Sequence, residues 1–183
     1  MPELPEVETI CTALRKVLLG AKITAAEQNG KLRKEHCTEE LNAFCKNKKI
    51  EKINRRGKYI LIEFSDKSGL ILHLGMTGAF VVDNDIENCL KHERTSWFLA
   101  DGRRWRYNDA RRFGAVQICE AEMGFDKHPA LKNLGIEPLS AKFNGAYLKK
   151  ITENSRMPIK NFIMNQNKIV GVGNIYASEA LFM

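Results

Sequence analysis

The 183-residue sequence has no apolar run long enough to span a bilayer, and no hydrophobic segment near its start that would serve as a secretion signal. Its five cysteines are odd in number, widely scattered and without a Cys-x-x-Cys pair. That pattern argues against a disulfide framework and against a zinc finger. Internal repeats and low-complexity segments are also lacking. These absences favour a globular protein of a reducing cytosol.

Acidic residues are in short supply, with 22 Asp and Glu against 29 Lys and Arg, for a net charge of +7. The excess suggests a polyanionic partner, nucleic acid first, although a generic basic surface would have the same composition. Five arginines fall at positions 103, 104, 106, 111 and 112, beside Trp105, Tyr107 and Phe113. Such a mixture suits a surface that meets phosphates and bases together.

The first twenty residues predict an amphipathic helix. Pro5 suits its first turn, apolar residues recur at helical spacing from Val7 to Leu18, and Gly20 is a stop signal. Removal of Met1 would leave the secondary amine of Pro2 free, with Glu3 beside it. A helix anchored by its apolar face would hold such an amine and carboxylate in place. On this stretch alone, however, an ordinary amphipathic helix is the favoured interpretation.

Residues 50–120 predict short strands joined by tight turns. Strands are expected on both sides of Gly57 over residues 50–64, at 70–74, at 79–82 and at 113–120. Gly75 and Gly78 bracket an exposed loop, residues 83–91 form a polar loop, and Asp101-Gly102 is a two-residue hairpin turn. The pattern indicates a helix with a β-sandwich or barrel, which we assign to a domain of residues 1–121.

Residues 122–139 read as a linker because they contain His128-Pro129, Gly135 and Glu137-Pro138. Helical periodicity returns over residues 143–151 and 159–166, and a glycine turn then leads to a helix expected to start at Ile175 with Asn174 as its cap. Residues 140–183 therefore form a second, helical domain. The fold class is α+β.

Five motifs together carry a resemblance to a known family: Pro2–Glu8, Arg55–Tyr59, His73–Gly78, Asp109–Gly114 and Gly171–Tyr176. In their order and spacing, the sequence resembles the bacterial formamidopyrimidine-DNA glycosylase (MutM) family. Leu4 stands where the sister branch, endonuclease VIII, typically has Gly, which favours the formamidopyrimidine branch. The resemblance implies an N-terminal helix with a β-sandwich, followed by an incomplete helix-two-turn-helix domain.

The resemblance implies catalytic roles for Pro2, Glu3 and Lys58. The Pro2 nitrogen is expected to attack C1′ of a damaged nucleoside and form a Schiff base, a form of amine catalysis. Glu3 is expected to act as general acid/base on the opening sugar, and Lys58 as a second catalytic cation. The implied activity is a DNA glycosylase with abasic-site lyase activity that excises oxidised purines, namely formamidopyrimidine and 8-oxoguanine, in base-excision repair.

The resemblance also implies DNA-binding roles. Met76, Arg111 and Phe113 match the triad that fills the gap left by an extruded nucleotide, although Met76 and Phe113 alone would suggest ordinary core packing. His92 matches a phosphate-contacting histidine and Asn174 a phosphate-gripping helix corner. Lys160 is a further candidate phosphate contact.

The family continues beyond the matched motifs with a four-cysteine zinc finger, so the chain is expected to be truncated before it. No cofactor is assigned to this chain, and one zinc ion is expected in the full-length family. The expected partner is damaged double-stranded DNA, without a membrane, for a monomer in the bacterial cytoplasm near the nucleoid. A non-catalytic, truncated DNA-binding remnant is the alternative. A basic RNA- or ribosome-associated protein ranks last because it leaves the spacing of five motifs unexplained.

Overall fold

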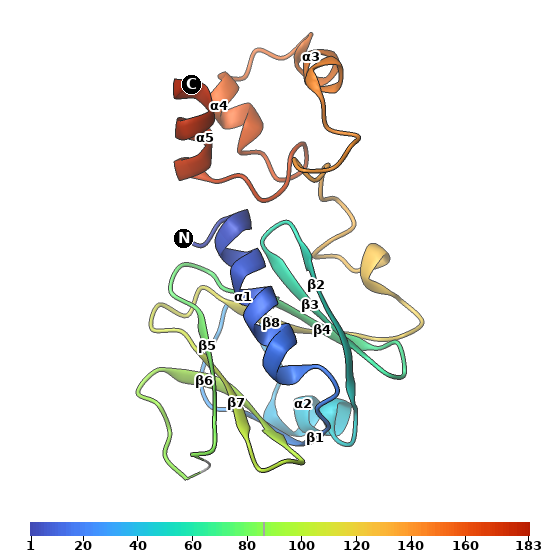
Figure 1. Ribbon diagram of the computed structural model, residues 1–183, viewed down its shortest axis with the longest axis vertical. Helices are drawn as coiled ribbons and strands as arrows, with labels where there is room; N and C mark the ends of the chain where they lie inside the picture. Colours follow the sequence, from blue (N-terminus) through green and yellow to red (C-terminus); the bar gives the residue numbers. More distant parts are fainter. Residues whose placement is uncertain (86) are drawn as a thin grey trace.

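A computed structural model describes residues 1–85 and 87–183 of the chain (Figure 1). In chain order, its elements are α1 (Leu4–Leu18), β1 (Ile23–Gln28), α2 (Thr38–Cys45), β2 (Ile50–Arg56), β3 (Tyr59–Phe64), β4 (Gly69–His73), β5 (Ala79–Asp83), β6 (Glu93–Leu99), β7 (Arg104–Asn108), β8 (Ala115–Cys119), the 3₁₀ turn η1 (Phe125–Lys127), α3 (Gly145–Thr152), α4 (Ile159–Ile163) and α5 (Asn174–Phe182). The expected α+β class is confirmed.

The strands form two antiparallel four-stranded sheets, with the orders β1-β6-β7-β5 and β2-β3-β4-β8. The predicted turns lie where the sequence indicated them. Gly57 (φ +56°) joins β2 to β3, and Gly102 (φ +87°) joins β6 to β7. Both angles lie in the left-handed region that glycine adopts without steric cost. The β2–β3, β3–β4 and β6–β7 pairs are local hairpins, whereas the β1–β6, β4–β8 and β5–β7 pairs join strands that are distant in the sequence.

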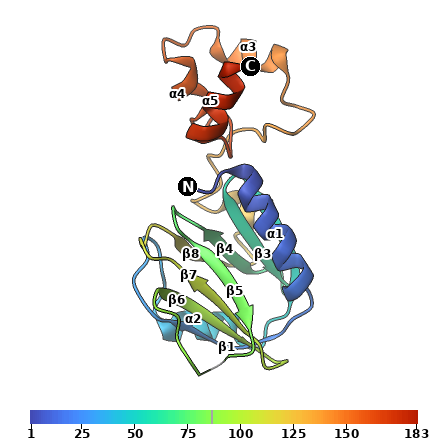
Figure 2. The same ribbon diagram turned by 60° about the vertical axis from the view of Figure 1, so that its left-hand side comes forward.

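One apolar core unites α1, α2 and both sheets. From α1 it receives the buried side chains of Val7, Cys11, Leu14 and Leu18, which recur on one face of the helix. At its centre the rings of Trp97 and Trp105 stack with their centroids 4.0 Å apart. Helix α1 is thereby fixed along its whole length, and its N-terminal end points toward the C-terminal helices (Figures 1 and 2).

Helices α3, α4 and α5 form a separate part beyond the N-terminal end of α1 (Figure 2). Asn144 caps α3 by accepting a hydrogen bond from the Tyr147 N–H at 2.9 Å. The predicted cap of the last helix is wrong, because α5 begins at Asn174 and Gly173 occupies its N-cap position without a side-chain bond of its own. In the part of the chain that the structure describes, no helix is long and apolar enough to cross a membrane.

Candidate functional site

The side chain of Glu3 is buried, with 2% exposure, and caps helix α5 from 170 residues away. Its Oε2 accepts hydrogen bonds from the backbone N–H of Gly173 at 2.6 Å and of Tyr176 at 3.3 Å, and its Oε1 accepts one from Ile175 at 2.9 Å. A carboxylate at a helix N-terminus meets both the free N–H groups and the positive end of the dipole. Glu3 thus does what the sequence assigned to Asn174.

Two glycines allow the chain ends to approach this closely. A Cβ on Gly173 would lie 2.4 Å from the Glu3 carboxylate carbon, and a Cβ on Gly171 would lie 2.7 Å from a methyl carbon of Leu4. Gly171 also has a φ of +82°, and its carbonyl accepts a hydrogen bond from the Leu4 N–H at 3.0 Å. The turn of residues 171–173 is therefore shaped to receive Glu3 and Leu4.

Glu6 also helps to fix the position of the N-terminal residues. Its Oε2 accepts a hydrogen bond from the Glu3 N–H at 2.9 Å, which forms a capping box, and its Oε1 accepts one from the Tyr176 hydroxyl at 3.1 Å. Burial acts to raise the pKa of Glu6, but these hydrogen bonds outweigh it and lower that pKa. Pro2 is half-buried immediately before this arrangement. The sequence motif contained Tyr176 but gave it no role.

Lys58 lies in the same region, at the start of β3, and its exposure is only 6%. Burial lowers the pKa of its ammonium group, while the nearby charges of Glu3 and Glu6 oppose that shift. The preceding Gly57 packs against the segment that joins α4 to α5, because a Cβ there would lie 3.1 Å from Cβ of Val170. The structure therefore brings Pro2, Glu3 and Lys58 together at the junction of the two parts.

Glu137, from the predicted linker, holds the β2–β3 turn in position. Its carboxylate accepts hydrogen bonds from Arg55 at 2.8 Å, Arg56 at 3.0 Å and the Gly57 N–H at 2.7 Å. Burial acts to raise the pKa of Glu137, but hydrogen bonds from Arg55, Gly57 and Arg56 and the charge of Arg55 outweigh it, so that pKa is lowered. The sequence analysis used Glu137-Pro138 only as a sign of a linker and missed this role.

We expect Glu137→Gln to lower the free energy of unfolding by about 1–3 kcal/mol, because it removes a charged acceptor from a partly buried network. Urea denaturation at pH 7 measures the loss. The control is Glu63→Gln on the same hairpin, where the carboxylate pairs with exposed Lys52 and Lys67, and it should cost less than about 1 kcal/mol. Equal losses for the two variants would contradict the role assigned to Glu137.

Three exposed side chains project from two neighbouring loops. Met76 is 39% exposed and Phe113 is 48% exposed, and the Arg111 guanidinium lies 5.1 Å from the centroid of the Phe113 ring. Core packing is thereby excluded for Met76 and Phe113. His92 is half-buried, and its carbonyl accepts a hydrogen bond from the Asp109 N–H at the start of the second loop.

The two remaining predicted contacts lie on the C-terminal helices. Asn174 is exposed at the first turn of α5, and Lys160 on α4 donates a hydrogen bond to Ser178 at 2.9 Å. Glu3 accepts from the backbone N–H groups of Gly173, Ile175 and Tyr176 at this helix end, whereas Asn174 is exposed to solvent.

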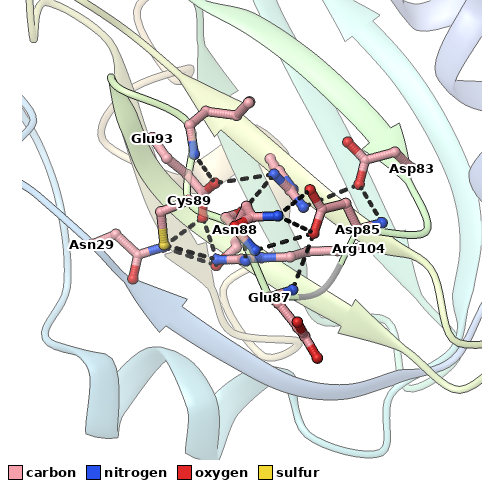
Figure 3. Close-up of polar contacts among 11 residues, drawn as sticks. Asn29, Asp83, Asp85, Glu87, Asn88, Cys89, Glu93 and Arg104 are labelled. Carbon is pink, nitrogen blue, oxygen red and sulfur yellow. Dashed lines mark hydrogen bonds and ion pairs between the residues drawn. The ribbon is translucent and has the colours of Figure 1, made fainter.

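The prediction that the arginine-rich stretch forms one aromatic, basic surface is wrong for much of its length. Trp105 and Tyr107 belong to the core, and Arg104 and Arg106 are at most 2% exposed. Figure 3 shows Arg104 close to Asn88 and Cys89, which precede β6, and to Glu93 at the start of β6, with which it pairs at 2.5 Å. Loop residues that the sequence did not place over β7 cover this face. The exposed basic residues of the stretch are Arg111 and Arg112, with Arg103 half-buried.

His73 lines a cavity of about 280 Å³ together with Arg33, Tyr59 and Phe113. Its Nδ1 accepts a hydrogen bond from the Gly75 N–H at 3.0 Å, so Nε2 carries the proton of the neutral ring. Burial, with the charges of Lys58 and Arg33, lowers the pKa of His73 to about 4. The ring is therefore uncharged at neutral pH.

His73 is expected to make the fold acid-sensitive. Between pH 6.5 and about 4, His73 is protonated in the unfolded chain but stays neutral in the folded protein. The free energy of unfolding therefore decreases as the pH falls through this window. The full loss amounts to as much as about 3 kcal/mol. Urea denaturation at pH 7 and pH 4.5 should show a smaller loss for His73→Asn, whose Oδ1 still accepts from Gly75, than for wild type. Parallel losses in the two proteins would refute this assignment.

The zinc ion implied by the family has no fitting ligand set in the residues that the structure describes. Among them, no three His, Cys, Asp or Glu side chains are grouped so that they could hold a metal ion. Cys11, Cys45 and Cys119 are buried separately, and Cys37 and Cys89 are exposed.

Family models match most of the chain. The model described as the formamidopyrimidine-DNA glycosylase N-terminal domain matches residues 1–116, and the one described as the H2TH domain of the same glycosylase matches residues 134–183. The chain is 43% identical to a formamidopyrimidine-DNA glycosylase of Legionella pneumophila (strain Lens), with 100% of the chain and 66% of that protein covered. The chain thus spans about two thirds of that protein's length.

Solved structures give the same picture. The wild-type Lactococcus lactis Fpg (MutM) in complex with N7-Benzyl-Fapy-dG containing DNA superposes with a TM-score of 0.89 at 32% identity, covering 98% of this chain and 66% of that one. The complex between Lactococcus lactis Fpg and an abasic site containing DNA gives 0.88 at 31% identity, with 98% and 65% covered.

Proposed function

Since the chain belongs to the formamidopyrimidine-DNA glycosylase family, we propose that it excises oxidised purines from duplex DNA and then cleaves the strand at the abasic site. Formamidopyrimidine and 8-oxoguanine are the proposed substrate bases. The observation that carries the proposal is the buried Glu3 carboxylate, fixed on the first N–H groups of α5 directly after Pro2. That arrangement gives an amine and a carboxylate a defined position.

Pro2 is the proposed nucleophile once Met1 has been removed. An α-amine has an ordinary pKa of about 7.7–8.0, so a useful neutral fraction exists at physiological pH. Its lone pair attacks C1′, and the bond to the base breaks with its electron pair on the base, which takes up a proton. Opening of the C1′–O4′ bond then yields a cationic iminium, the Schiff base. The iminium acidifies C2′, whose deprotonation expels the 3′ phosphate.

Glu3 and Lys58 assist these steps. Glu3 serves as general acid/base at O4′ of the opening sugar, within the region that the α5 N-terminus fixes. Lys58 acts at the sugar and its phosphate. Because burial lowers the pKa of Lys58, a DNA phosphate arriving beside it would favour the charged ammonium form.

The exposed side chains supply the proposed DNA contacts. Met76 and Phe113 are apolar wedges for the gap left by an extruded nucleotide, and Arg111 can hydrogen-bond the unpaired base. His92, Lys160 and Asn174 are proposed phosphate contacts, and the net charge of +7 also favours DNA binding.

Borohydride trapping on a duplex with a central abasic site tests the proposal. Wild-type protein, with loss of Met1 verified by intact mass, should give a covalent adduct and nick the strand. The second candidate function is a non-catalytic DNA-binding protein of the same family, which would need only the exposed DNA contacts. It predicts salt-dependent binding without adduct or nicking, and that result would replace the first proposal.

A further inference from the structure

The two loops that carry the exposed wedge residues are in backbone contact. One loop, residues 74–78, joins β4 to β5, and the other, residues 109–114, joins β7 to β8. Gly75 has a φ of +59°, and a Cβ there would lie 2.5 Å from the Phe113 carbonyl carbon. The loops therefore pack main chain against main chain, which places Met76 beside Arg111 and Phe113.

A single buried carboxylate ties these loops together. Asp109 has no exposed surface. Its Oδ1 accepts hydrogen bonds from the Thr77 hydroxyl at 2.5 Å and the Arg111 N–H at 3.2 Å, and its Oδ2 accepts one from the Gly114 N–H at 2.8 Å. The three donors come from both loops, so the carboxylate fixes the first loop relative to the second.

The main chain of Asp109 connects the same point to β6. Its N–H donates to the His92 carbonyl at 2.9 Å, and its carbonyl accepts from Nε of Arg94 at 2.8 Å. All three donors to the carboxylate are neutral, and a buried carboxylate with neutral partners is costly unless every one of those bonds is kept. The Asp109 carboxylate therefore favours a single arrangement of the two loops, the one in which all of its hydrogen bonds are formed.

We propose that Asp109 is a positioning residue that holds the Met76 loop and the Arg111–Phe113 loop as one rigid wedge for entry into the DNA stack. The inference rests on the proposed function for the role of the wedge, but Asp109 touches neither the sugar nor the base. Loops that are already ordered lose little conformational entropy when they enter the duplex. Extrusion of the nucleotide is therefore faster than it would be with mobile loops.

The first experiment measures unstacking without chemistry. A duplex carries a non-cleavable tetrahydrofuran abasic analogue with 2-aminopurine as the 3′ neighbour, and fluorescence is recorded at saturating protein. Wild-type protein should raise the fluorescence as the neighbour unstacks, and Asp109→Asn should lose most of that rise, because one carboxylate acceptor becomes a donor facing N–H or O–H groups. An unchanged rise in Asp109→Asn would overturn the proposal. This readout applies even if the wild-type protein forms no Schiff base, so it separates the two proposals.

The second experiment compares borohydride trapping on the same abasic strand, single-stranded and in duplex. Asp109→Asn should lower the duplex rate by about tenfold to a hundredfold and leave the single-strand rate within about twofold, because no duplex has to be opened there. An equal loss on both substrates would mean a general structural role and would refute the proposal.

Milder variants keep the test valid if Asp109→Asn fails to fold. Thr77 is exposed, and Thr77→Val removes one of the two hydrogen bonds to Asp109 Oδ1 while the bond from the Arg111 N–H remains, so this variant is milder than Asp109→Asn and should reduce the fluorescence rise. Thr77→Ser keeps the hydroxyl and should restore the rise to the wild-type value. The matched control is Asp101→Asn on the β6–β7 hairpin, where the carboxylate pairs with Arg103 on the surface and no loss is expected.

Discussion

Insertion of one glycine between Met1 and Pro2 is expected to lower borohydride trapping on abasic DNA by at least about a hundredfold. The ring nitrogen becomes an amide without a nucleophilic lone pair, and the new terminal amine stands one residue away from the position that Glu3 fixes. A displacement of that size is enough to remove the benefit of orientation. Single-turnover trapping, with intact mass to verify loss of Met1, measures the effect.

The control for this variant is one glycine inserted after Gly102, in the exposed β6–β7 turn, which should leave trapping unchanged. DNA binding by both variants should stay close to wild type. If the variant extended before Pro2 still traps at the wild-type rate, another amine is the nucleophile. Peptide mapping of that adduct would then be directed first at Lys58.

Glu3→Gln is expected to damage both chemistry and stability. As general acid/base, Glu3 should contribute a factor of about 10²–10⁴ to the rate of base excision. Both of its carboxylate oxygens accept N–H groups of α5, so the amide of Gln leaves at least one N–H unpaired. The expected loss of unfolding free energy is about 1–3 kcal/mol, and a loss of this size shifts Tm by about 2–4 °C for each kcal/mol.

The two effects of Glu3→Gln are separated by measuring excision of a damaged base well below the variant's Tm, alongside urea denaturation. Glu6→Gln is the matched control. Glu6 is exposed, and the amide oxygen of Gln can still accept from the Glu3 N–H. It should change both quantities far less. Excision by Glu3→Gln at the wild-type rate would remove Glu3 from the proposed mechanism.

The sequence was informative wherever structure depends on neighbouring residues. Helix α1 follows from the apolar spacing between Val7 and Leu18, and the two hairpins follow from Gly57 and Asp101-Gly102. Helix α2 was missed because its pattern is only eight residues long and tertiary bonds support it. Thr38 and Asn42 accept hydrogen bonds from the backbone N–H groups of β1.

The predicted site residues could be named from motifs, whereas the contacts that hold them are long-range. Asn174 is a good cap by local rules, yet the N–H groups of α5 bind Glu3 from the other end of the sequence. The roles of Asp109 and Glu137 depend in the same way on donors from distant segments. Arg104 and Arg106 looked exposed because nothing in the spacing shows that Asn88 and Glu93 cover them.

The bond between Glu3 and the start of α5 also sets the order of events during synthesis. Its partners, residues 173–176, are translated about 170 residues after Glu3 itself. At about 5–20 residues per second, the ribosome needs roughly ten to thirty seconds to make them. Throughout that interval the N-terminus of the nascent chain has none of these partners and stays open to the removal of Met1 that the proposed mechanism requires. The proposed site can therefore close only after Pro2, the proposed nucleophile, has had time to be freed.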